Sequence, residues 1–172
     1  MAAPLTLTGN PNAHDISEFS TSLTSTCLCK AIRVTITDDE LFTRPRGHLC
    51  HCANCRKVAG SYVSSNLAIE KEKVTVEDPQ GAMKRYEDWD TGSGKKVERC
   101  LDAEKEGADD IHSPIMSIAE ILPTTVIVKM GMFPRIPKPE CESFALHRHS
   151  WQGKHDGVTQ YEIGRGGKVL GG

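Results

Sequence analysis

The sequence is poor in aromatic residues and lacks any long apolar run. Of its 172 residues, 5% are Phe, Trp or Tyr, and all hydrophobic types together make up 38%. No stretch approaches the roughly 20 apolar residues that a membrane-spanning helix needs, so we expect no membrane partner. A core this lean in large side chains would gain stability from a metal ion that crosslinks loops.

The chain also lacks a strong charge of either sign and a recognisable secretory signal. Its formal net charge is -2 and its sequence pI is near 6.4. Because no basic stripe is present, nucleic acid is not expected as a partner. Residues 1–7 contain neither a basic segment nor a long apolar core, so we expect a cytoplasmic protein.

The cysteines form the most informative pattern in the sequence. The seven cysteines are an odd number, and five of them fall into two tight groups. Cys27 and Cys29 are spaced C-x-C, whereas Cys50, Cys52 and Cys55 are spaced C-x-C-x-x-C. Without a secretory signal, such spacing favours metal binding over disulfide bonds. Clustered thiolates are typical ligands of zinc.

The ligand count predicts two zinc sites, each of which is one ligand short. Cys27 and Cys29 provide two donors for a structural zinc, and Cys100 could supply a third from across the fold. The second group of three thiols leaves one position for water or substrate, as a catalytic zinc site does. A closed alternative would recruit a fourth ligand, such as His48, His51 or His149.

The apolar pattern has mostly a period of two and predicts an all-β fold with few or no helices. We expect a flexible arm over residues 1–18, one zinc-binding domain over residues 19–165 and a flexible tail over residues 166–172. Prolines at 134, 137 and 139 predict an extended connector before the last segment. The expected strands lie at 31–36, 61–69, 73–76, 83–86, 96–99, 115–118, 125–129 and 144–147.

Two motifs resemble a known family, the glutathione-dependent formaldehyde-activating enzymes, which also include centromere protein V. The run CLCKAI at 27–32 is close to that family's C-x-C-G-A-V opening. The run CHCANCRKVAG at 50–60 is close to its C-H-C-x-x-C-R-x-x-x-G signature. Weaker matches follow in the same order at 84–86, 92–95, 113–115 and 157–162.

The resemblance implies a zinc-bound β-tent made of small antiparallel sheets. It implies a structural zinc held by the C-x-C pair and a later C-x-x-C pair, and a catalytic zinc held by Cys50, Cys52 and Cys55. The activity that the resemblance implies joins glutathione to formaldehyde and gives S-hydroxymethylglutathione.

The sequence departs from the family pattern where the later cysteine pair should end. If Ser113 is aligned with the family's G-S-P-I segment, Ile111 stands where a cysteine is expected, and isoleucine cannot bind zinc. His112 could supply the missing ligand, since imidazole suits zinc. Asp109 or Asp110 could also do so, or the site could be three-coordinate, weak or empty.

Polar residues around the central motif are candidates for catalysis and substrate binding. His51 could act as an acid or base, or it could be a solvent-exposed loop residue. Arg56 could bind a substrate carboxylate or the ligand sulfurs. The remaining substrate candidates are Asn54, Ser61, His147 and His149.

Three functions are compatible with these patterns. The first is a zinc-dependent carbon–sulfur lyase-like enzyme that acts on a small thiol adduct or electrophile, with glutathione as a candidate substrate. The second is a zinc enzyme of the same fold that catalyses elimination, isomerisation or hydration of a specialised metabolite. The third is a non-catalytic zinc module that binds a partner. In each case we expect one or two zinc ions per chain.

Overall fold

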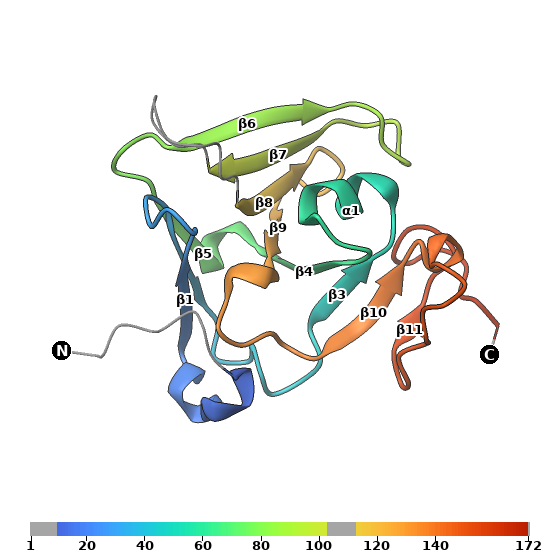
Figure 1. Cartoon of the computed structure of the whole chain (residues 1–172), viewed down its shortest axis with the longest axis horizontal. Helices are drawn as coiled ribbons and strands as arrows, with labels where there is room; N and C mark the ends of the chain where they lie inside the picture. The colour runs from blue at the N-terminus through green and yellow to red at the C-terminus, as the bar shows by residue number, and fades with distance from the viewer. Residues whose placement is uncertain (1–9, 103–112, 172) are drawn as a thin grey trace.

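The computed structural model describes residues 10–102 and 113–171, which form two β-sheets and one α-helix (Figure 1). The smaller sheet is antiparallel and has the strand order β1-β2-β5. Its strands are β1 (Ser22–Thr26), β2 (Arg33–Thr37) and β5 (Val74–Glu77). In β2 the alternating sequence buries Val34 and Ile36 and exposes Arg33 and Thr37, as the period of two predicts.

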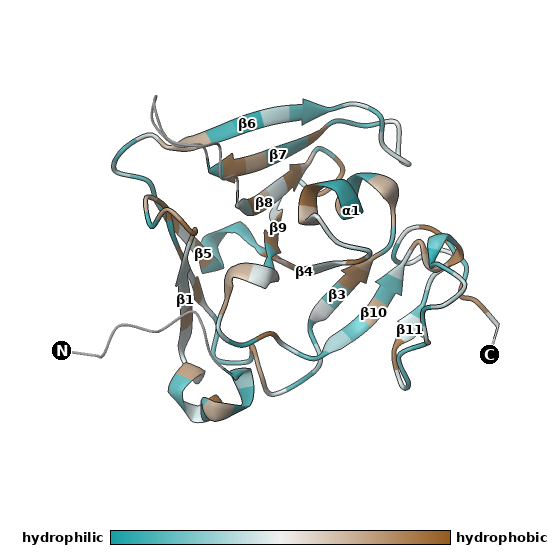
Figure 2. Cartoon of the chain, viewed as in Figure 1, coloured by the Kyte–Doolittle hydropathy of each residue, from teal (hydrophilic) through white to brown (hydrophobic). Residues whose placement is uncertain are grey.

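The larger sheet has the order β11-β10-β3-β4-β9-β8-β7-β6 in the described chain. Figure 2 shows that β8 is largely hydrophobic, whereas the edge strand β6 is mostly hydrophilic. The strands are β3 (Gly47–Cys50), β4 (Ser64–Glu70), β6 (Met83–Asp88), β7 (Val97–Asp102), β8 (Pro114–Ala119), β9 (Thr125–Lys129), β10 (Pro139–Ser143) and β11 (Thr159–Gln160).

The two faces of the larger sheet differ in chemistry. Leu67 and Ile69 of β4 and Val128 of β9 lie in the apolar core, which they share with Val34 and Ile36 of the smaller sheet. The alternate positions of β4 and β9 carry polar groups, among them Asn66 and Lys129, on the opposite face. The single α-helix of the described residues, α1 (Ala53–Ala59), contacts β4.

Helix α1 has clear sequence signals at both ends. The Cys52 side chain accepts a hydrogen bond from the Cys55 backbone N–H and so caps the N-terminus. Gly60 ends the helix in the left-handed region, with φ 58° and ψ 31°, a conformation that glycine adopts without strain. Five short 3₁₀ helices complete the described secondary structure: η1 (Pro11–Ala13), η2 (Ile16–Phe19), η3 (Lys71–Lys73), η4 (Met130–Met132) and η5 (Ala145–His147).

The all-β prediction is confirmed, with three differences in detail. One sheet is large rather than small, and β10 pairs in parallel with both β3 and β11. The strand expected at 144–147 is wrong, because Phe144 has a left-handed backbone with φ 56° and residues 145–147 form a 3₁₀ helix. Strands β1, β3, β10 and β11 were missed, since short segments rich in Thr, Ser, Cys or Pro carry little periodic signal.

The segments at the two ends of the predicted domain make specific contacts. Residues 10–18, assigned to a flexible arm by the sequence, include η1, and Arg135 donates hydrogen bonds to the carbonyls of Pro11 and His14. In the predicted tail, Leu170 N donates to Gln160 O at 2.8 Å and Val169 bridges Tyr161. Among the described helices, none combines the length and apolar character needed to cross a membrane.

Candidate metal centre

The three-cysteine centre forms where β3 meets α1. Cys50 is the last residue of β3, Cys52 caps α1, and Cys55 lies in its first turn. The three Sγ atoms lie within 4.8 Å of one another, and Cys55 N is 3.3 Å from Cys52 Sγ. A strand end followed at once by a helix start therefore gathers the three thiols that the spacing singled out.

The thiols of this centre influence one another strongly. Hydrogen bonds from Cys50 and Cys52 lower the pKa of Cys55 to about 2, and the positive charges of Lys129 and Arg99 act in the same direction. Hydrogen bonding to Cys52 and Cys55, together with burial, raises the pKa of Cys50. One thiolate therefore forms readily, and further ionisation requires an added positive charge such as a bound divalent metal.

The geometry fits a metal site with an open position. In the part of the chain that the structure describes, no fourth cysteine, histidine or carboxylate joins the group of Cys50, Cys52 and Cys55. The three histidines considered as closing ligands, His48, His51 and His149, all stay outside it. Three thiolates suit zinc, and a missing fourth protein ligand is what distinguishes catalytic from structural zinc sites.

His51 is buried on the side of β10 that carries Glu142, and it is not exposed to solvent. Its side chain is 1% exposed, and Nε2 lies 3.5 Å from Glu142 Oε2. Cys50 is paired with Ser143 of β10, and the two side chains lie on the same face. Because successive side chains alternate, His51 points to the opposite face. Burial lowers the pKa of His51, while the Glu142 carboxylate opposes that shift. The geometry favours an anchoring role, and the catalytic role of His51 stays a prediction.

Glu142 is the shared hydrogen-bond acceptor of two side chains from the C-terminal segment. This fully buried carboxylate accepts hydrogen bonds from Arg148 and His155, and Arg148 also donates to Gln160 Oε1 at 3.0 Å. Burial raises the pKa of Glu142, but the hydrogen bonds from Arg148 and His155 outweigh it, so its pKa lies below the ordinary 4.5. The network ties residues 148–160 to β10 and, through His51, to the centre.

Arg56 connects the three-cysteine centre with a group of contacting rings formed by His149, Trp151 and Tyr62. Its Nη1 lies 2.8 Å from His149 Nε2, and the His149 ring stacks on Trp151 with centroids 5.6 Å apart. Tyr62 meets Trp151 edge to face at 5.3 Å. Trp151 is 68% exposed. Of the predicted substrate residues, only His149 is thus joined to Arg56.

The other predicted substrate residues are placed differently. Asn54 donates through Nδ2 to both carboxylate oxygens of Asp88, at 3.1 and 3.0 Å, and therefore holds α1 to the end of β6. Ser61 is exposed just after α1. His147 is also exposed, and its ring contacts Phe144 rather than the cysteines.

The first predicted zinc site contains a carboxylate where the sequence suggested a thiol. The Sγ atoms of Cys27 and Cys29 are 3.1 Å apart, and Cys29 Sγ lies 3.4 Å from Asp102 Oδ2. These two cysteines and Asp102 form a possible metal-binding group. Cys100 is not part of it and is buried in the apolar core. His112, Asp109, Asp110 and Ile111 fall outside the described residues.

The surroundings of this group hold its donors in place. Asp102 is fully buried and accepts a hydrogen bond from Ser113 N, while Ser113 Oγ accepts one from Leu28 N at 3.2 Å. Burial, followed by hydrogen bonding to Cys29, raises the pKa of Cys27 to about 12. The donor set of two thiols and one carboxylate fits zinc, which accepts sulfur and carboxylate oxygen.

We expect Asp102, and not Cys100, to determine the metal content of the first site. In the Asp102→Asn variant, the side-chain carbonyl can still accept the bond from Ser113 N, but the anionic donor is lost. Zinc affinity at this site should fall by at least about tenfold. Cys100→Val is the matched control and should retain the metal. The measurement is zinc per chain by elemental mass spectrometry after dialysis against a chelator; loss of metal in Cys100→Val alone would reverse the assignment.

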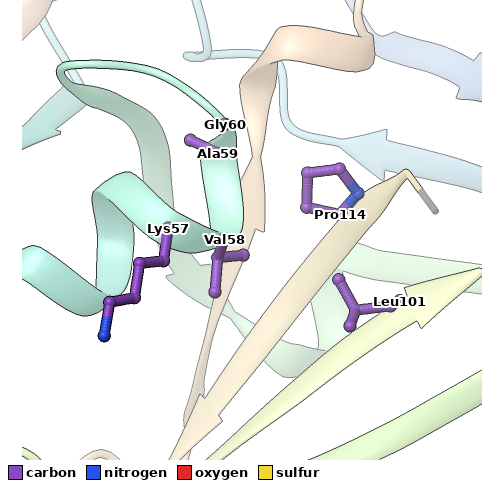
Figure 3. A pocket seen from close by; sticks show the side chains of 6 residues that line it. All are labelled: Lys57, Val58, Ala59, Gly60, Leu101 and Pro114. Carbon is purple, nitrogen blue, oxygen red and sulfur yellow. The ribbon is translucent and has the colours of Figure 1, made fainter.

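A shallow pocket of about 440 Å³ lies beside the C-terminal half of α1 (Figure 3). Val58, Ala59, Leu101 and Pro114 give it an apolar lining, and the Lys57 side chain points away from the strand residues. Val58 and Ala59 follow Cys55 by three and four residues and so share its side of the helix. The pocket is therefore a place where the apolar part of a small molecule could rest.

Sequence reasoning missed the buried polar groups below α1. Arg99 donates to Asp88 Oδ2 at 3.0 and 2.6 Å, and Lys129 donates to Asn66 Oδ1 at 2.7 Å. Lys129 directly follows an apolar run in β9, and a charged residue at such a place is the signal that could have found it. Arg99 and Asp88 lie in strands that carry several other charged residues, so no such signal marks them.

Comparison with known proteins agrees with the motifs. Residues 22–147 match the sequence model of a family described as "Glutathione-dependent formaldehyde-activating enzyme". The match spans both cysteine groups, α1 and all strands from β1 to β10. A search of curated proteins found no match.

Proposed function

Since the chain belongs to the glutathione-dependent formaldehyde-activating enzyme family, we propose that it is a zinc-dependent, carbon–sulfur lyase-like enzyme. Its substrates would be a small thiol, with glutathione as the first candidate, and a small aldehyde such as formaldehyde. The observation that carries the proposal is the three-cysteine group, whose sulfurs converge without a fourth donor among the described residues.

The reaction requires one bond to form and one proton to move. The thiol sulfur bonds to the aldehyde carbon, the carbonyl π bond opens, and the proton lost by the thiol ends on the new hydroxyl. Cys50, Cys52 and Cys55 would hold the zinc ion. When bound, the ion would supply Lewis acidity, which favours the thiolate form of a substrate thiol.

The residues of the chain would bind and orient the thiol substrate. Arg56 follows the last cysteine, and its Nη1 is positioned by His149. A guanidinium suits a carboxylate, of which glutathione has two, because it presents paired donors. The pocket beside Val58 and Leu101 would give the remainder of a small substrate an apolar surface to rest on. Asn54 would keep α1, and with it Arg56, in register with the sheet.

The test combines metal content with turnover. We expect protein purified without added metal to contain two zinc ions per chain by elemental mass spectrometry. It should accelerate the exchange between glutathione, formaldehyde and their adduct, measured by two-dimensional exchange NMR against the uncatalysed rate. Removing the metal should abolish the acceleration, and adding zinc should restore it.

Zinc-loaded protein that gives no acceleration with glutathione or other small thiols would refute the proposal. A zinc-dependent reaction with a different small metabolite would then favour the elimination, isomerisation or hydration alternative.

A further inference from the structure

Lys129 is a buried cation on the face of the larger sheet that carries the three-cysteine centre. It is the last residue of β9, and its side chain is 3% exposed. Burying an ammonium group away from water costs several kcal/mol unless an anion compensates it. Within the described residues, Lys129 Nζ donates a hydrogen bond to Asn66 Oδ1 at 2.7 Å, and this amide oxygen is a neutral acceptor.

The negative charges that act on this ammonium come from the thiols of the centre. Within the described residues, no salt bridge joins Lys129 to a carboxylate. The other buried cations of the described residues, Arg46 and Arg99, are matched by Asp38 and Asp88. Burial lowers the pKa of Lys129, and the negative charges of Cys55, Cys50 and Cys52 oppose that shift. Full ionisation of the thiols on metal binding would therefore favour the ammonium form.

The strand register explains why Lys129 faces the cysteines. Lys129 of β9 is paired with Asn66 of β4, and Asn66 is paired with His48 of β3. Directly paired residues of neighbouring strands share one face. In the next row on that face, Ser64 is paired with Cys50. The ammonium thus belongs to the same polar surface as the first cysteine, two strands away.

The net charge of the metal-bound centre suggests a role for Lys129. Three thiolates and one divalent cation leave one net negative charge, which disfavours an anionic fourth ligand. We propose that Lys129, oriented by Asn66, is the counter-charge of the three-cysteine centre and allows its open position to accept an anion such as a thiolate. Lys129 is then a positioning residue, since it acts through the charge of the centre. The inference rests on the metal site that the proposed function uses.

The test measures ligand binding rather than turnover. Cobalt(II) replaces zinc, and its visible absorption reports a fourth ligand at the centre. The probes are thiocyanate, which is anionic, and imidazole, which is neutral. In Lys129→Met we expect thiocyanate affinity to fall by about tenfold or more, because removing one positive charge from the protein interior weakens the binding of an anion there. Imidazole affinity should be unchanged.

Matched variants separate charge from packing. Lys129→Arg keeps the positive charge and should retain thiocyanate binding. Lys84→Met removes an exposed lysine of β6 and should change nothing. Asn66→Asp keeps the lysine but gives it a carboxylate partner, so it should weaken thiocyanate binding as Lys129→Met does. If Lys129→Met does not fold, Asn66→Asp tests the counter-charge role of Lys129 in its place.

Two outcomes would overturn the proposal: equal weakening of thiocyanate and imidazole, or no weakening of either in both Lys129→Met and Asn66→Asp. The thiocyanate signal should vanish in Cys52→Ser, which confirms that it arises at the three-cysteine centre. A protein that binds thiocyanate with the expected charge dependence but does not accelerate the thiol–aldehyde reaction would refute the proposed function alone.

Discussion

Replacing Cys52 with serine is expected to remove one metal ion per chain and to abolish turnover while leaving α1 intact. A serine hydroxyl is a poor replacement for a thiolate as a zinc ligand, so the centre loses one of its three donors. The same side chain accepts a hydrogen bond from Cys55 N and caps the helix. Serine is among the preferred residues at this position, so the cap survives the change.

Cys52→Ala is the informative control, because it removes the ligand and the cap together. In the metal-free proteins, the alanine variant should lose about 1 kcal/mol of unfolding free energy relative to the serine variant. Zinc per chain, exchange NMR and urea denaturation provide the three measurements. Cys52→Ser that retained full zinc content and wild-type turnover would exclude this residue from the metal centre.

Replacing Arg148 with methionine is expected to have the largest effect on stability. The change leaves the fully buried Glu142 without its main cation, and breaking a buried ion pair in this way costs about 3 kcal/mol or more. Arg165→Met is the control, because Arg165 pairs with Glu140 at 2.6 Å but is 48% exposed. Such a surface pair contributes at most about 1 kcal/mol. Similar urea midpoints for the two variants would contradict the assignment of Glu142 as a buried, paired carboxylate.

The unfolding free energy that Arg148→Met loses should depend on pH in a definite direction. The pKa of Glu142 in the folded protein lies below 4.5 because the hydrogen bonds from Arg148 and His155 outweigh the effect of burial. A lowered carboxyl pKa stabilises the fold above the unfolded pKa, and this contribution disappears as the pH falls through the folded value. The difference in unfolding free energy between wild type and Arg148→Met should therefore be full at pH 7 and shrink below about pH 4.5.

The sequence predicted the parts of the site that local spacing determines. Cys50, Cys52 and Cys55 lie within six residues, so any compact backbone brings their sulfurs close together. A strand with strict alternation, such as β2, was also within reach, because one buried face imposes a period of two. The all-β class followed from these segments.

The remainder depends on pairing between distant strands. Asp102 reaches Cys29 from a strand 73 residues away, and no spacing rule connects them. Cys100 was predicted as the third ligand because of its thiol, whereas the Asp102 carboxylate, two residues later, lies beside Cys29. Lys129 gains Asn66 through the register of β4 and β9, and Glu142 meets His51 through the parallel addition of β10 to β3. Such contacts cannot be read from a single segment.

The brevity of α1 has a consequence for motion. It has seven residues, none of which is buried, and isolated helices of this length are not stable in water. In metal-free protein, local opening of this segment would cost little free energy, so its amide hydrogens should exchange with solvent much sooner than those of β4. Metal bound to Cys52 and Cys55 would fasten the helix to the end of β3. Occupancy of the centre would then set how often, and for how long, water reaches the sheet surface beneath the helix.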